Sequence, residues 1–179
     1  MAKANMYARW MGLSPVVATQ VPYSLTGRAP EREIMPFAKE DDIAVTAWGM
    51  INGGVLTGKY RDADVTKRYD GASDQALAMG DAVVALAKEI GRTPAQVAIN
   101  WVRQQQGKAQ VIPILGARTV AQLQDNLGVL DFELTPEQIQ NIEAIAPFEI
   151  GFPRSFLLGE HVLNLIHGKT AGLLDNHRK

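Results

Sequence analysis

The stretch VIPILGARTVAQLQDN, from Val111 to Asn126, decides how the rest of the chain is interpreted. Its apolar start, Val111 to Leu115, is typical of a buried parallel strand. Gly116 then allows the backbone to approach a ligand closely. We expect the following helix to carry Arg118 in its first turn, so that its free N–H groups and the guanidinium face an anion. The pattern predicts a phosphate site, although an ordinary strand-turn-helix with a surface arginine fits the same residues.

The composition is that of an ordinary globular protein. The 179 residues are enough for one domain with a sizeable core. Hydrophobic residues make up 46% and charged residues 21% of the chain, which is usual for soluble domains. The net charge of −1 gives no reason to expect binding to nucleic acid or to an anionic membrane. Because cysteine is absent, disulfide bridges and thiolate chemistry are excluded.

The histidines and the apolar segments bear on metal binding and location. His161, His167 and His177 all lie in the last nineteen residues, and their spacing fits no metal motif. The N-terminus, MAKANMYARWMGL, lacks the uninterrupted apolar region of a signal peptide. No apolar run reaches the length of about 18 residues that indicates a membrane span. We therefore expect a cytoplasmic protein without a metal site or a membrane partner.

Hydrophobic periodicity predicts helices that alternate with short apolar strands. The expected strands cover residues 16–23, 43–48 and 111–115, and the expected helices cover residues 3–13, 31–40, 73–90, 94–106 and 135–146, with one more after residue 118. Residues 147–179 are too irregular to form another unit of this kind. Alternation of this type predicts an α/β fold with parallel strands and helices outside them.

Several of these helices have recognisable starts and buried faces. Capping boxes are expected at Thr93–Gln96, Thr119–Gln122 and Thr135–Gln138. Helix 31–40 is expected to turn Ile34, Phe37 and Ala38 inward, and helix 73–90 to bury Leu77, Val83, Val84, Ala87 and Ile90.

Polar and aromatic residues at the ends of the first two strands are candidate ligand contacts. The Gln20 amide can pair with another amide, or it can cap a loop backbone. Trp48 can be a core residue or a platform for a cofactor. The glycine-rich segment after Trp48, which ends in Lys59, permits close approach of an anion, but a plain flexible loop also fits. It is not a P-loop, because GxxxxGK[ST] is absent.

Four segments in order, QVPYSL, VTAWGMINGGVLTGKY, GRTPAQVAINWV and VIPILGARTVAQLQDNLG, resemble the aldo/keto reductases. The resemblance runs from about Ala2 to Ala146, and GFPRSFL in the tail is similar to the bacterial members. It implies a partial (β/α)8 TIM barrel, with strands six to eight at residues 16–20, 43–48 and 111–115. Residues 1–146 would then be the C-terminal half of the barrel, and residues 147–179 an irregular C-terminal extension.

The resemblance also implies NADP(H) as the cofactor and suggests its contacts. Gln20 is similar to the glutamine that binds the nicotinamide carboxamide, and Trp48 to the aromatic residue that stacks on the ring. Where the family usually has Ser-Pro, this chain has Gly49-Met50, which loosens the loop. The remaining implied contacts are Gly53, Leu56, Gly58 and Lys59 at the pyrophosphate, and Gly116, Arg118, Gln122 and Asn126 at the 2′-phosphate and adenine.

No residue of this chain matches the Asp, Tyr, Lys and His of the family's catalytic tetrad, which belong to the earlier half of the barrel. A positioned acid contributes roughly 10²–10⁴-fold to a rate, and oxyanion stabilisation a comparable factor. The resemblance therefore implies a nucleotide-binding half that is inactive alone. Two alternatives remain: a competent carbonyl reductase when complemented by an N-terminal half, and a non-catalytic, oligomeric interaction protein.

Three parallel strands cannot close a barrel, which needs eight. They leave two strand edges and one apolar face uncovered. We therefore expect the chain to associate, either as a homo-oligomer or with a complementary N-terminal half.

Overall fold

The computed structural model describes residues 1–61, 71–157, 162, 165–166 and 168. The chain divides into two compact units, Met1–Pro147 and Phe148–Lys179. The three histidines considered above lie outside the described residues. Within the described part, no helix is both long and apolar enough to span a membrane.

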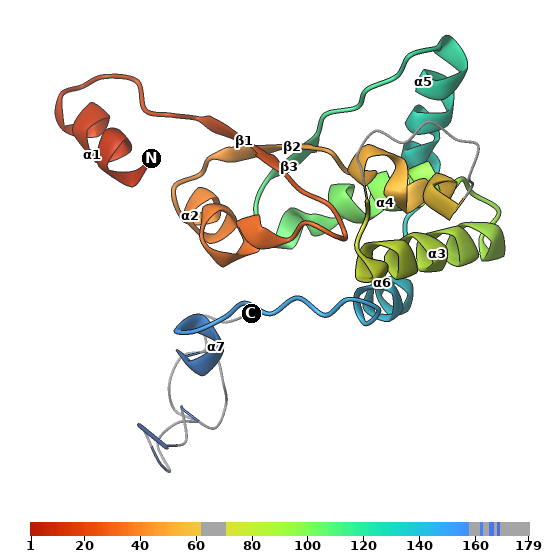
Figure 1. The fold of residues 1–179 in the computed structure, drawn as a ribbon. Helices are drawn as coiled ribbons and strands as arrows, with labels where there is room; N and C mark the ends of the chain where they lie inside the picture. The colour runs from red at the N-terminus through yellow and green to blue at the C-terminus, as the bar shows by residue number, and fades with distance from the viewer. Residues whose placement is uncertain (62–70, 158–161, 163–164, 167, 169–179) are drawn as a thin grey trace. The chain divides into compact units, whose positions relative to one another are not determined.

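The first unit contains a three-stranded parallel sheet in the order β1-β2-β3, with helices packed against one of its faces (Figure 1). This confirms the predicted α/β class and the parallel strands. The strands are β1 Ala18–Pro22, β2 Ala44–Trp48 and β3 Val111–Pro113. The α-helices are α1 Ala2–Trp10, α2 Ile34–Glu40, α3 Asp74–Glu89, α4 Pro94–Arg103, α5 Val120–Leu127 and α6 Pro136–Glu143. Short 3₁₀ segments are η1 Ala29–Arg32, η2 Asn52–Thr57, η3 Lys59–Arg61, η4 Gln105–Gly107 and η5 Gly128–Asp131.

One face of the sheet is buried under helices. Val45, on the central strand, is paired with Val111 of β3, and both side chains are buried. They belong to a single core with Met35 of α2, Met79 of α3 and Trp101 of α4. Because side chains alternate along a strand, the same register sends every second residue to the opposite face.

The opposite face of the sheet is exposed. The register places Gln20 beside Thr46 and Thr46 beside Ile112 on this face. Exposure reaches 44% for Trp48, 46% for Ile112 and 40% for Ile114. The expected uncovered apolar face is therefore confirmed at these positions.

The helix starts follow the sequence signals. Thr93 and Thr135 both form complete capping boxes, with Gln96 and Gln138 respectively. At α5 only half of the expected box forms: the Thr119 hydroxyl accepts from the Gln122 N–H at 3.2 Å. The Gln122 side chain instead accepts a hydrogen bond from the Arg118 N–H.

Some local predictions were wrong. The expected helix 31–40 is split into η1 and α2, since Glu33 between them has φ −142° and ψ −50°, which lies outside the helical region. Val84 is 37% exposed, because the buried stripe of α3 runs instead through Met79, Val83 and Ala87.

The second unit contains the four-residue helix α7 Arg154–Leu157, and the expectation of an irregular C-terminal extension stays a prediction.

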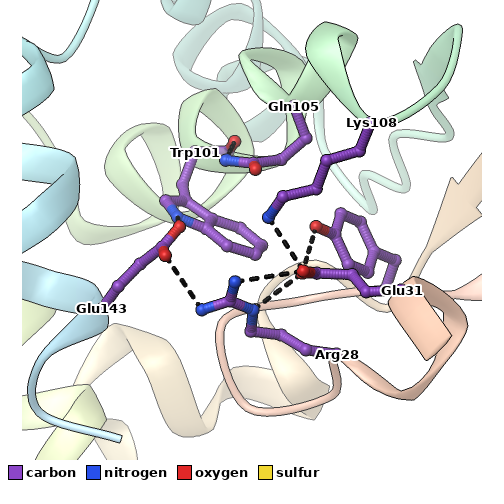
Figure 2. A network of polar contacts seen from close by, with 7 residues as sticks. Arg28, Glu31, Trp101, Gln105, Lys108 and Glu143 are labelled. Atoms are coloured by element: carbon purple, nitrogen blue, oxygen red, sulfur yellow. Dashed lines mark hydrogen bonds and ion pairs between the residues drawn. The ribbon is translucent and has the colours of Figure 1, made fainter. Parts of the chain in front are cut away.

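A buried ionic network ties the segment after β1 to α4 and α6 (Figure 2). Glu31 is at its centre. Its carboxylate accepts hydrogen bonds from the Tyr23 hydroxyl at 2.7 Å and from Arg28 Nε at 2.7 Å, and it forms an ion pair with Lys108 at 3.0 Å. The side chains of Arg28 and Glu31 are 10% and 9% exposed, so this is a desolvated cluster.

Arg28 extends the network to α6. Its guanidinium forms an ion pair with Glu143 at 3.0 Å, and the other oxygen of Glu143 accepts from Trp101 Nε1 at 3.0 Å. The Trp101 ring also has two cations against it, Arg28 at 5.5 Å and Lys108 at 5.6 Å from the centroid. Such contacts stabilise desolvated cations. The network therefore fixes the segment after β1 against two helices.

The network makes the stability of the fold depend on pH, with losses expected at both low and high pH. Burial raises the pKa of Glu31, but hydrogen bonds from Arg28, Tyr23 and Lys108 outweigh it and lower the pKa overall. Stability from Glu31 is thus present above its unfolded pKa of about 4.3 and is lost as pH falls through the lower folded value. Burial and the Glu31 carboxylate raise the pKa of Tyr23, so its contribution is complete below about pH 10 and declines at higher pH.

We expect Glu31→Gln to lower the free energy of unfolding by about 3 kcal/mol at pH 7, because Arg28 and Lys108 lose their shared carboxylate. The variant should also lose less of its remaining stability than the parent between pH 7 and pH 3. Urea unfolding followed by circular dichroism measures both. Glu89→Gln, at an exposed position of α3, is the control and should behave like the parent. Equal pH slopes for parent and Glu31→Gln would contradict this role.

Candidate functional site

The carboxyl ends of the three strands meet at one edge of the sheet, and the predicted nicotinamide contacts lie there. The register pairs Pro22 with Trp48, and Gln20 is two residues before Pro22. Gln20 and Trp48 therefore lie on neighbouring strands and on the same, uncovered face. Trp48 is not a core residue, since 44% of it is exposed. One exposed amide and one exposed ring thus share this end of the sheet.

The glycine-rich segment after β2 has an ordered, left-handed backbone. Asn52, Gly53 and Gly54 have φ values of 46°, 63° and 103°, and Gly49 and Gly58 have 73° and 79°. Conformations of this kind favour glycine. The segment is also internally bonded, with the Asn52 N–H donating to the Gly49 carbonyl at 2.8 Å. A plain flexible loop, the alternative left open by the sequence, does not describe it.

The same segment is anchored from beneath by its apolar side chains. Leu56 is fully buried in the core, so only its backbone can face a ligand. Gly80 of α3 lets the segment pack closely, because a Cβ at Gly80 would lie 2.5 Å from the Val55 carbonyl oxygen. The groups left for an anion are the glycine backbone and the exposed Lys59.

The turn between β3 and α5 is held in shape by two amide side chains. Gln122 Oε1 accepts from the Arg118 N–H at 2.8 Å, and Asn126 Nδ2 donates to the Gly116 carbonyl at 3.3 Å. These bonds use Gln122 Oε1 and Asn126 Nδ2, so both residues position the turn. Arg118 itself is exposed, and the first turn of α5 has no acidic residue to oppose an anion.

Helix α5 is in turn fixed to the start of α4. Asp125 accepts from the Thr93 hydroxyl at 3.0 Å, and its carbonyl accepts from Gln96 Nε2 at 2.7 Å. Thr93 and Gln96 are the two members of the α4 capping box. The capping box of α4 therefore holds the C-terminal turn of α5, the helix whose N-terminus follows Arg118.

The predicted site residues lie in three places: the carboxyl end of the sheet, the segment after β2 and the turn after β3. Sequence reasoning did not find the network around Glu31. A sequence signal for this network was the three-residue spacing of Arg28 and Glu31, which allows the i,i+3 ion pair seen in the structure. Its other members, Tyr23, Lys108 and Glu143, are too far apart in the sequence to be associated by pattern.

Residues 2–147 match the family model described as the aldo/keto reductase family. The chain belongs to the aldo/keto reductase family. Members of this family generally use NAD(P)H.

Similar proteins include oxidoreductases of fungi and bacteria. The chain is 32% identical to the aryl-alcohol dehydrogenase [NADP(+)] of Phanerodontia chrysosporium, over 97% of this chain and 48% of that protein. It is 31% identical to norsolorinic acid reductase of Emericella nidulans, over 87% and 40% respectively. The solved glycerol dehydrogenase of Gluconobacter oxydans superposes with a TM-score of 0.63 at 27% identity, covering 80% of this chain and 47% of that one.

The chain spans about half the length of the curated relatives it matches, with coverage of 56%, 49% and 43% of three of them. Family membership and the α/β architecture thus apply to the first unit of this chain. The activity of the whole relatives does not follow from this match alone.

We expect Gly80→Ala to destabilise this aldo/keto reductase segment by about 1–3 kcal/mol, because the new methyl group would overlap the Val55 carbonyl. Elsewhere in a helix the same change stabilises by roughly 0.5–1 kcal/mol. Thermal and urea unfolding measure the difference. Gly107→Ala, where a Cβ would meet no atom within 4 Å, is the control and should change stability by less than about 0.5 kcal/mol. A stabilised Gly80→Ala variant would contradict the close packing of η2 on α3.

Proposed function

We propose that this chain binds NADP(H) as the C-terminal, nucleotide-binding half of an aldo/keto reductase barrel, with β1, β2 and β3 as strands six to eight. The observation that supports this most is the common location of Gln20, Trp48 and the turn after β3 at the carboxyl edge of one parallel sheet. Ligands of parallel α/β folds bind at that edge.

The residues present fit a nicotinamide ring. The exposed Gln20 amide offers one donor and one acceptor group, which complements a carboxamide. The exposed ring of Trp48 gives a flat apolar surface on the same face of the sheet. In this proposal Trp48 stacks on the nicotinamide, and Gln20 sets the rotation of its carboxamide. The bound dinucleotide supplies the hydride.

The residues also fit the phosphate groups. The left-handed backbone at Gly53 and Gly54 permits close approach of a pyrophosphate, with Lys59 nearby in the chain. Arg118 precedes the N-terminus of α5, where free N–H groups and the helix dipole favour an anion. An arginine at a 2′-phosphate favours NADP over NAD. Gln122 and Asn126 keep the turn in the required shape.

The proposed chemistry of the isolated chain ends with cofactor binding. Hydride transfer to a carbonyl needs a proton donor for the resulting oxyanion, and the family's tetrad supplies it. No residue of this chain matches that tetrad. Without the donor, a factor of roughly 10²–10⁴ in rate is lost from proton transfer alone. We therefore propose that the isolated chain binds nucleotide but reduces carbonyls at most in traces.

We expect NADPH to quench the fluorescence of Trp48 with a Kd at or below about 1 mM, equivalent to roughly 4 kcal/mol. Trp48→Phe should abolish the quenching, which assigns the signal among the three tryptophans. Arg118→Ala should weaken NADPH binding about tenfold and leave NADH binding unchanged, because only NADPH has the 2′-phosphate. Lys88→Ala, an exposed cation on α3, is the matched control. Absence of quenching at several millimolar NADPH would overturn the proposed function.

A further inference from the structure

The glycine-rich segment after β2 contains a chemically reactive dipeptide, Asn52-Gly53. The backbone nitrogen that follows an asparagine can attack its side chain, and glycine hinders this attack least because it has no Cβ. Asn52 is the only asparagine in the sequence that is followed by glycine. The sequence therefore offers one favourable position for spontaneous deamidation.

The structure separates Asn52 from the other asparagines of the described residues. Those four lie within α-helices and precede larger residues: Asn5, Asn100, Asn126 and Asn141. In an α-helix the next backbone nitrogen donates to a carbonyl one turn earlier, which holds it away from the asparagine side chain. Asn52 instead begins η2, with a left-handed φ of 46°.

Both groups that would react are available. Asn52 is partly exposed, and its carboxamide makes no hydrogen bond within the described part of the chain. The backbone bonds of this segment pass over Gly53, since they run from the Asn52 N–H to Gly49 and from the Gly54 N–H to Ile51. Gly53 and Gly54 have φ values of 63° and 103°, which interrupt the helical bonding at this point.

We propose that Asn52-Gly53 is a site of spontaneous deamidation, and that its products weaken nucleotide binding by the segment after β2. The effect on binding rests on the proposed function, whereas the modification does not. In that function the backbone at Gly53 and Gly54 approaches a pyrophosphate. The nitrogen that attacks Asn52 therefore belongs to the same stretch of backbone.

The reaction requires only water as a co-reactant. The Gly53 nitrogen loses its proton and bonds to Cγ of Asn52, the Cγ–Nδ2 bond breaks, and the side-chain nitrogen leaves with that proton as ammonia. The product is a cyclic succinimide. Water then opens the ring at Cγ, which gives aspartate, or at the main-chain carbonyl carbon of Asn52, which gives isoaspartate.

Both products oppose the binding of an anion. Each has a carboxylate where the parent has a neutral amide, next to the backbone at Gly53. Isoaspartate also inserts the Cβ of residue 52 into the main chain, because the peptide bond then runs through Cγ. The longer main chain disturbs the left-handed turn, which rests on α3 through Gly80.

Ageing of the purified chain in mildly alkaline buffer at physiological temperature tests the site. Trypsin releases residues 40–59, in which Asn52 is the only amide side chain, so the mass gained by exchange of NH₂ for OH is assigned to it. We expect conversion within about tenfold of the rate in a synthetic peptide of residues 48–58, since a partly exposed segment opens at low cost. Asn141, exposed on α6, should keep its amide in the same sample.

Variants connect the modification with binding, which is followed by NADPH quenching of Trp48. Parent converted by ageing should bind NADPH at least about fivefold more weakly than fresh parent, and Asn52→Asp should show a similar loss without ageing. Asn52→Gly removes the amide and suits the left-handed backbone, so its affinity should not change on ageing. Asn141→Asp adds the same charge on α6 and should bind like the parent. Circular dichroism of each sample separates lost binding from lost folding.

Two outcomes would contradict the inference: no mass gain in residues 40–59 under conditions that convert the synthetic peptide, or a converted chain that binds NADPH as tightly as the fresh chain. A fresh chain that shows no quenching overturns the proposed function, and the effect on binding with it. The mass measurement decides the modification in either case.

Discussion

One-sided burial of the parallel sheet is the constraint on which the other features of the first unit depend. Val45 and Val111 face a core made by helices, whereas Trp48, Ile112 and Ile114 face outward. The covered face supplies the apolar burial that holds three short strands in register. The uncovered face leaves Gln20 and Trp48 accessible at the carboxyl edge. The same asymmetry therefore explains the stability of the unit, the accessibility of the candidate site and the exposed apolar residues of the uncovered face.

A sheet of three short strands needs support beyond its own ladder. The network around Glu31 provides it at the segment after β1, which it joins to α4 through Trp101 and to α6 through Glu143. A buried network of this kind adds little net energy when complete, but removing one member is strongly destabilising. The main effect of the network is therefore to determine where α6 packs, and its net contribution to stability is small. Because Tyr23 follows β1 directly, the network also holds the end of the strand that carries Gln20.

The candidate cofactor site is built from backbone as much as from side chains. The left-handed turns at Gly53 and Gly54 rest on α3 through the small Gly80. The turn before α5 is shaped by Gln122 and Asn126, and α5 is fixed to the capping box of α4. The candidate cofactor-binding residues therefore fall into two groups. Some are exposed and can contact a nucleotide, and others hold the neighbouring backbone in place. Arg118 and Lys59 belong to the first group, and Leu56 and Asn126 to the second.

The sequence by itself determined the order of elements, the parallel strands and the starts of α3, α4 and α6. These depend on local signals: apolar runs, capping residues and glycine stops, whose effects act within one or two turns. Only the tertiary structure decided that Val84 is exposed and that the helix expected at 31–40 breaks at Glu33. It also assembled Tyr23, Glu31, Lys108 and Glu143 into one network. Contacts between residues far apart in the chain depend on packing geometry, and no local pattern in the sequence encodes that geometry.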